Sequence, residues 1–118
     1  MATTSRSDNE EMRFLTIKIL GRLERINIDD ISYIKAEGAY SLLLMQDKRE
    51  YLHEKNLEKL LGLLPEKYSR VHRSCLVAMD RVKALLKHEG SRYELELING
   101  ECIPLGRTRY KELKSHFD

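Results

Sequence analysis

The segment Arg70–Ser74 gathers two arginines, one histidine and one serine into five consecutive positions. Each arginine carries a planar fork of N–H donors that can bind O6 and N7 of guanine together, whereas histidine and serine suit phosphates or base edges. An extended stretch around residues 68–72 leads into this segment, so we expect a loop at the end of a strand. The candidate nucleic-acid contacts in this loop are Arg70, His72, Arg73 and Ser74.

A second basic segment, Gly106–Tyr110, lies where the chain is predicted to enter its last helix. The first backbone N–H groups of a helix have no partner within the helix, and they favour a bound phosphate. Arg107 and Arg109 add two positive charges at this place. We therefore expect both arginines to contribute to the same kind of interface.

Charge is distributed unevenly along the chain, although the net charge is only +2. Residues 67–92 and 107–114 together carry eleven basic and three acidic residues, a net charge of +8, and the rest of the chain carries −6. Such asymmetry is typical of a protein with a nucleic-acid-binding face. Charge alone leaves open a second interpretation, in which the basic residues scatter over the folded surface.

Residues suited to catalysis or metal binding do not gather in this sequence. The four histidines are scattered, and His72 and Cys75 form the only close pair of potential ligands. On an extended segment these two side chains would point to different faces, which disfavours a zinc site or a Cys–His dyad. We therefore expect no enzyme activity, no cofactor and no metal, and we expect both cysteines to be reduced thiols.

Length and composition predict one small domain. With 118 residues, of which 42% are hydrophobic, the chain can bury one modest core. We expect residues 1–12 to be a disordered N-terminal arm or linker remnant and residues 13–118 to be the domain. The longest apolar runs fall far short of the roughly 20 residues of a spanning helix, and no signal peptide is recognisable. These features predict a cytoplasmic protein that does not enter the membrane.

Alternation of apolar and polar residues predicts a mainly β protein. The period of two over residues 15–19 and 92–98 is typical of half-buried strands, and further strands are expected at 26–28, 31–36, 40–45, 49–53, 81–87 and 101–105. Asn99-Gly100 is a strong hairpin signal. Two short helices are expected, one over 56–64 that begins at the N-cap Asn56 and ends before Pro65, and one over 108–117 with Phe117 on its apolar face.

Three stretches of this sequence, in their order and spacing, resemble the LytTR family of DNA-binding domains. They are residues 31–40, ISYIKAEGAY; residues 68–77, YSRVHRSCLV; and Asn99-Gly100 followed by Leu105-Gly106-Arg107. The resemblance covers about residues 14–117. Family members commonly carry Asn where this chain has Ala78, and Ser where it has Gly106.

The resemblance implies an elongated arrangement of short antiparallel β-sheets with two or more small helices. It also implies sequence-specific binding of double-stranded DNA in the major groove, through loop residues that match Tyr40, Ser41, Arg73 and Arg107. Simpler roles remain open for some of these side chains. His72 could brace its loop, Arg73 and Arg107 could pair with acids, and Tyr40 could belong to the core.

The resemblance further implies a bacterial transcription regulator, the output domain of a two-component response regulator with a receiver domain elsewhere on the full-length chain. We expect the free domain to be a monomer and two copies to occupy direct-repeat sites on DNA. The alternative is a β-rich module that binds protein or RNA.

Overall fold

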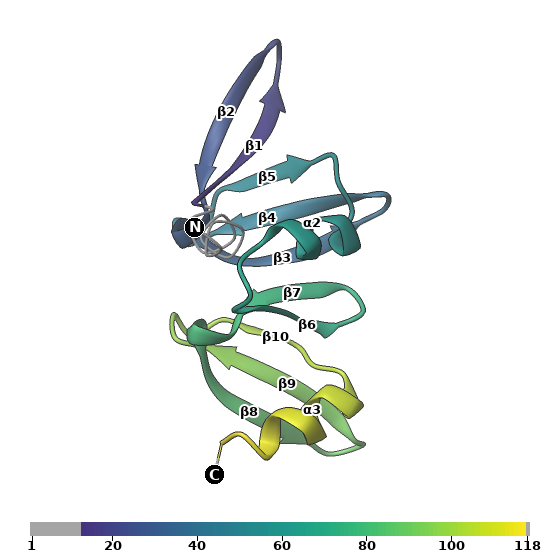
Figure 1. Cartoon of the computed structure of the whole chain (residues 1–118). Coiled ribbons are helices and arrows are strands. Elements are labelled where there is room, and N and C mark those ends of the chain that lie inside the picture. Colours follow the sequence, from purple (N-terminus) through teal and green to yellow (C-terminus); the bar gives the residue numbers. More distant parts are fainter. Residues whose placement is uncertain (1–12, 118) are drawn as a thin grey trace, which may run out of the picture.

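The computed structural model describes residues 13–117, which form short antiparallel sheets with two α-helices (Figure 1). The predicted N-terminal arm, residues 1–12, lies outside the described residues. The elements are β1 (Phe14–Ile19), β2 (Arg22–Asn27), η1 (Ile28–Asp30), β3 (Ile31–Glu37), β4 (Tyr40–Met45), β5 (Glu50–His53), α2 (Leu57–Leu63), β6 (Tyr68–His72), β7 (Cys75–Ala78), η2 (Met79–Arg81), β8 (Val82–His88), β9 (Arg92–Leu97), β10 (Cys102–Pro104) and α3 (Arg107–Lys114).

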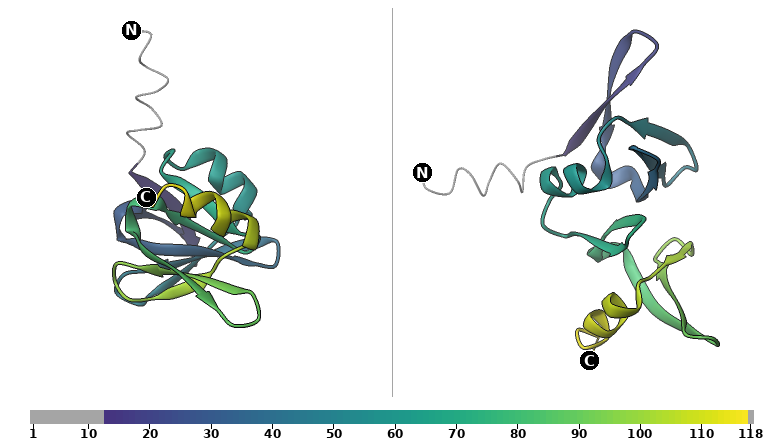
Figure 2. Two further views of the ribbon diagram at one scale, coloured as in Figure 1. Left: turned by 90° about the horizontal axis from the view of Figure 1, so that it is seen from below. Right: turned by 90° about the vertical axis from the view of Figure 1, so that its right-hand side faces the viewer.

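Three sheets follow one another along the molecule (Figures 1 and 2). The hairpin β1-β2 comes first, a five-stranded sheet of order β5-β4-β3-β7-β6 lies in the middle, and a three-stranded sheet of order β10-β9-β8 comes last. The radius of gyration is 15.0 Å, whereas a compact domain of this length has about 13.5 Å. The elongated, mainly β fold expected from the sequence is confirmed.

Two hydrophobic cores lie on opposite faces of the five-stranded sheet, and β7 contributes to both. Leu76 of β7 joins the first core with β1, β2, β3, β4 and α2, whereas Val77 joins the second with β9, β10 and α3. All four residues of β7 are buried. The two cores are therefore linked through β7, together with Tyr68 and Val71 of the neighbouring β6.

The prediction identified no separate strand at Cys75–Ala78, which the structure shows to be β7. A strand that is buried on both faces has no polar alternation, so its sequence is a plain apolar run. The Asn99-Gly100 hairpin is confirmed, but its loop has three residues: Leu97 pairs with Glu101, and Gly100 has a φ of 95°. This geometry fits a turn that ends in a left-handed glycine.

Both helices occur close to their predicted places. Asn56 accepts a hydrogen bond from the Lys59 backbone N–H at 2.9 Å, which confirms it as the N-cap of α2. The second helix, α3, runs over Arg107–Lys114 and ends three residues before the predicted end. Phe117 is 49% exposed, so its predicted place on the buried face of that helix was wrong. The chain has already left the helix when it reaches Phe117, and Leu113 is the last side chain of α3 in the core.

Several connections lie on one edge of the molecule, the right-hand edge in Figure 1. They are the β3–β4, β6–β7 and β8–β9 turns and the start of α3. The β3–β4 turn has two residues, with Gly38 at a φ of 62° in its first position. This is the type II′ pattern, in which glycine is favoured. The predicted site residues occur on or near these connections.

Candidate nucleic-acid interface

The β6–β7 turn holds Arg73 on a braced backbone. His72 of β6 pairs with Cys75 of β7, so the turn between them consists of Arg73 and Ser74 alone. The Ser74 backbone N–H donates to Nδ1 of His72 at 3.1 Å, and the Ser74 hydroxyl lies 2.8 Å from the same nitrogen. Arg70 donates to the backbone carbonyl of Arg73. The backbone of the turn is thus fixed by its own neighbours, while the Arg73 side chain points out from it, exposed.

His72 has a defined role in this turn. Its Nδ1 accepts from a backbone N–H, so the proton of the neutral ring lies on Nε2. Partial burial, together with the neighbouring charge of Arg73, lowers the pKa of His72 below its ordinary value. A neutral ring keeps Nδ1 free to accept the bond that shapes the turn. The structure thus shows His72 bracing its loop, and contact of His72 with DNA stays a prediction.

The start of α3 lies against the same turn. Gly106 donates its backbone N–H to the carbonyl of Val71 at 2.8 Å, and it accepts the first helical bond from Tyr110. Gly106 gives α3 no side-chain cap. A Cβ at this position would lie 3.6 Å from the Val71 carbonyl oxygen, which is an ordinary contact, so the serine common in the resembled family would fit. Arg107 follows as the first residue of α3, and its side chain is exposed.

The two turns share an open cleft of about 540 Å³. Its lining residues are Arg70, His72, Arg73, Gly106, Arg107, Thr108 and Arg109. The structure therefore brings together most of the predicted site residues, although the two segments lie more than thirty positions apart in sequence.

The arginines at this cleft divide into two groups. Arg109 contacts the Ser69 hydroxyl and Glu112, and Arg70 is bonded to the β6–β7 turn, so both are engaged inside the protein. The side chains of Arg73 and Arg107 make no hydrogen bond or ion pair among residues 13–117. Their guanidinium groups are available to a ligand. The alternative in which they pair with acids of the described chain is not what the structure shows.

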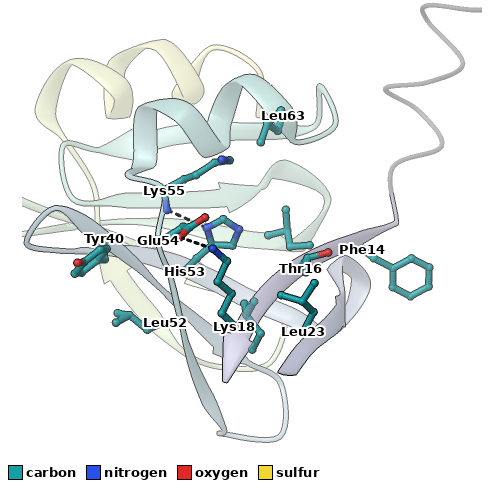
Figure 3. Close-up of a pocket in the computed structure, with 12 residues that line it drawn as sticks. Phe14, Thr16, Lys18, Leu23, Tyr40, Leu52, His53, Glu54, Lys55 and Leu63 are labelled. Carbon is teal, nitrogen blue, oxygen red and sulfur yellow. Dashed lines mark hydrogen bonds and ion pairs between the residues drawn. The ribbon is translucent and has the colours of Figure 1, made fainter. Parts of the chain in front are cut away.

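Tyr40 and Ser41 lie apart from this cleft. Tyr40 is 48% exposed and stands at the β3–β4 turn, at one end of an apolar groove of about 510 Å³ (Figure 3). Ser41 is fully buried, and its hydroxyl donates to the carbonyl of Lys55 at 2.7 Å. This bond fastens β4 to the segment before α2. Ser41 therefore has a structural role here, whereas the exposed Tyr40 is accessible to a ligand.

A polar cluster on the opposite edge joins the three-stranded sheet to the five-stranded sheet. Asn99 Nδ2 donates to Ser32 Oγ at 3.1 Å and to Gln46 Oε1 at 3.0 Å. Ser32 is 1% exposed and donates to Glu101, which also pairs with Lys48 at 3.4 Å. Partial burial would raise the pKa of Glu101, but these hydrogen bonds hold it below its ordinary value. These hydrogen bonds link the β9–β10 loop to β3 and to the residues that follow β4.

Comparison with known proteins gives the family. A profile of the LytTr DNA-binding domain matches residues 21–118. The chain belongs to the LytTR family. Membership confirms the expected class of function, DNA binding in the regulation of transcription, and does not favour an RNA-binding or protein-binding module.

Relatives of this LytTR domain are longer proteins. The sensory transduction protein LytT of Bacillus cereus is 30% identical over 106 residues, which are 88% of this chain and 42% of that protein. The LytT protein of Bacillus anthracis is 29% identical over the same share of each chain. The CO-responsive transcriptional regulator RcoM of Rhodospirillum rubrum is 28% identical over 77% of this chain and 39% of its own length. The chain thus spans about two fifths of these relatives.

A solved structure shows the same fold. The LytTr DNA-binding domain of a putative methyl-accepting/DNA response regulator from Bacillus cereus superimposes with a TM-score of 0.73 at 20% identity. The match covers 90% of this chain and 97% of that one. The LytTR fold expected from the sequence is therefore confirmed.

Two departures of this LytTR domain from the family pattern can be located. Ala78 is the N-cap residue of η2 and offers no side-chain cap. The asparagine common in the family would be suited there to accept a hydrogen bond from a backbone N–H of η2. Gly106 likewise leaves α3 without a side-chain cap. Both departures concern the ends of short helices, and Gly106 lines the cleft without a side chain.

The part of the chain that the structure describes gives little support for a metal site or a reactive thiol. No three His, Cys, Asp or Glu side chains converge there to hold a metal ion. Burial raises the pKa of the Cys75 thiol, which keeps it protonated and unreactive. Cys75 and Cys102 are both free thiols. No helix of residues 13–117 is long and apolar enough to cross a membrane.

We expect this LytTR domain to lose stability as the pH falls below about 6.5. Burial is the main cause that lowers the pKa of both His53 and His72, so the unfolded chain binds more protons than the folded one below that pH. Urea unfolding at a series of pH values between 7.5 and 5.5 checks this. Nδ1 of His53 accepts a hydrogen bond from the Lys55 backbone N–H at 3.0 Å. The double variant His53→Asn/His72→Asn keeps a hydrogen-bond acceptor in each side chain and should flatten the profile. A wild-type domain whose stability stays constant or rises on acidification contradicts the assignment.

Proposed function

We propose that this domain reads double-stranded DNA from the major groove with the exposed side chains of its loop edge. Arg73 and Arg107 would contact bases or phosphates from the adjoining turns, and Tyr40 would contact the duplex further along the same edge. The observation that carries the proposal is the pair of side chains of Arg73 and Arg107. They have no hydrogen-bond or ion-pair partner among residues 13–117, and they stand on turns whose backbones are held by hydrogen bonds. Such preorganisation reduces the entropy lost when the side chains bind.

The remaining predicted residues are proposed as supports. Arg70, His72 and Ser74 shape the β6–β7 turn through hydrogen bonds within it. Arg109 ties α3 to Ser69 of β6. These bonds place Arg73 and Arg107 next to each other, so substitution of a support should weaken DNA binding by disordering a turn.

Recognition of single-stranded RNA on a sheet surface would require exposed aromatic side chains that stack bases. The exposed aromatic residues of this domain are Phe14, Tyr40 and Phe117. Phe14 begins β1 and Phe117 follows α3, at opposite ends of the described chain, and the Phe14 ring is covered by the Arg25 guanidinium at 4.2 Å. No stacking platform is formed, which supports duplex DNA as the ligand.

The domain is proposed to act within a longer regulator in the bacterial cytoplasm. The LytT relatives are sensory transduction proteins of which this chain matches only 42%. This supports a signal-receiving part, such as a receiver domain, elsewhere on a full-length protein. We propose that the free domain is a monomer and that two copies bind direct repeats, one copy per half-site.

Binding to DNA is expected to weaken steeply with salt. The two basic segments carry a net charge of +8 and should displace counterions from several phosphates. For each phosphate contacted, the slope of log K against log salt is about −0.9. A duplex enriched from a random-sequence pool by the wild-type domain serves as the probe (the selected duplex), with the same bases in random order as its control (the shuffled duplex).

Anisotropy titrations at several salt concentrations measure this slope, with single-stranded RNA as a competitor. We expect a slope of several units for the selected duplex, and RNA should compete poorly. A slope near zero contradicts the proposed electrostatic contacts. Stronger competition by RNA than by unlabelled duplex contradicts duplex DNA as the ligand.

A further inference from the structure

A second cleft opens beside the first, between β9 and the start of α3. It has a volume of about 380 Å³ and adjoins the same β6–β7 turn. Arg92 and Glu94 line it from β9, His72 lines it from β6, and Gly106 and Arg107 line it from the start of α3. The β8–β9 turn reaches the loop edge there (Figure 1).

Arg92 differs from most other arginines of the domain. Arg22, Arg49, Arg70, Arg81 and Arg109 all have hydrogen-bond or ion-pair partners, and Arg25 lies over an aromatic ring. The arginines whose side chains make no such contact among residues 13–117 are Arg13, Arg73, Arg92 and Arg107. Three of these four lie around the two adjoining clefts.

The position of Arg92 is set by a tight turn. Arg92 of β9 pairs with His88 of β8. The connection between them includes Gly90 and Ser91, which have φ values of 78° and 61°. Two left-handed residues in succession reverse the chain sharply, and this brings Arg92 to the mouth of the cleft. The Arg92 side chain is exposed.

The cleft also contains one acid, Glu94, which already has a partner. Its carboxylate lies 2.8 Å from Nε2 of His88, on the neighbouring strand. Arg92 and Arg107 therefore give the cleft a net positive charge, with Glu94 engaged elsewhere. The first backbone N–H groups of α3, an eight-residue helix, lie at the same place and are not used by the helix itself.

Two guanidinium groups that flank an open cleft can bind the oxygens of one phosphate from two sides. The walls of the DNA major groove are lines of phosphates, so a group that stands just beside a base-reading side chain meets the backbone. We infer that the cleft between β9 and α3 seats one backbone phosphate of the bound duplex, held by Arg92 together with the start of α3. This inference rests on the proposed function, and it adds a contact to that interface.

The test compares Arg92→Gln with the charge-matched control Arg22→Gln, on the selected and shuffled duplexes. Arg22 is exposed on the β1-β2 hairpin, remote from the cleft. Arg92→Gln should weaken binding to both duplexes alike, by roughly three- to tenfold, and lower the salt slope by about 0.9. Arg22→Gln should change both quantities much less. Thermal melting checks that each variant is folded.

A second arm uses selected duplexes in which one phosphate at a time is replaced by a neutral methylphosphonate. One position should weaken binding by the wild-type domain and have no further effect on Arg92→Gln. Equal affinities for Arg92→Gln and Arg22→Gln, a loss confined to the selected duplex, or identical methylphosphonate profiles would each overturn the inference. If Arg73→Ala weakens binding while Arg92→Gln does not, the proposed function stands and only this inference fails. Absence of any wild-type binding would overturn both.

Discussion

Replacement of Leu95 by alanine is expected to lower the free energy of unfolding by about 2–5 kcal/mol. Leu95 is fully buried at the centre of β9, where it pairs across the sheet with Leu85 on one side and Ile103 on the other. Its removal leaves a cavity under α3, whose Leu113 packs into the same core. Urea unfolding of the variant and of the wild type measures the difference.

The control for this variant is Leu52→Ala on β5. Leu52 is 48% exposed, so its truncation should cost far less than that of Leu95. Because β7 is shared by both cores, Leu95→Ala should still unfold in one transition, although Leu95 belongs to the second core alone. Equal losses in the free energy of unfolding for Leu95→Ala and Leu52→Ala would contradict the argument that burial sets the cost. A separate early transition of the C-terminal sheet contradicts the linkage through β7.

Arg73→Ala is expected to lose about 1–3 kcal/mol of binding free energy on the selected duplex. The Arg73 side chain is exposed and makes no bond within residues 13–117, so its loss should leave the fold unchanged. The turn itself is held through the backbone carbonyl of Arg73, which alanine retains. Titrations on the selected and shuffled duplexes at one salt concentration measure the effect.

A matched control for Arg73→Ala is Lys114→Ala. Lys114 is exposed near the end of α3, away from the cleft, and a lysine acts on DNA mainly as a point charge. Lys114→Ala should lose less binding free energy than Arg73→Ala, and it should lose the same amount on both duplexes. If Arg73→Ala also loses the same binding free energy on both duplexes, Arg73 binds a phosphate and does not read a base.

Local patterns were sufficient to predict much of the fold. Alternation located β1 and β9, and Asn56 and Pro65 marked the ends of α2, because each of these signals acts over a few residues. Strand β7 was missed because a strand buried on both faces shows no alternation. Phe117 was placed wrongly because a helical period does not reveal where a helix leaves its core.

The sequence predicted the two basic segments but not which of their arginines are bonded within the protein and which are available to a ligand. Arg109 is engaged with Ser69, forty positions earlier in the chain, and Ser32 bonds to Glu101 across sixty-nine positions. Contacts at such separations arise from the fold, so charge and motif could not distinguish available arginines from engaged ones. Arg92 was counted only as one more positive charge, since the cleft that gives it a role is assembled from three strands and a helix.

Methylation interference on the selected duplex tests most directly whether Arg73 reads a base in the major groove. Dimethyl sulfate modifies guanine N7 in the major groove and adenine N3 in the minor groove. We expect methylation of one guanine N7 to block binding by the wild-type domain and to have no further effect on Arg73→Ala. The same interference pattern in both proteins, or interference at adenine N3 alone, would contradict base reading by Arg73.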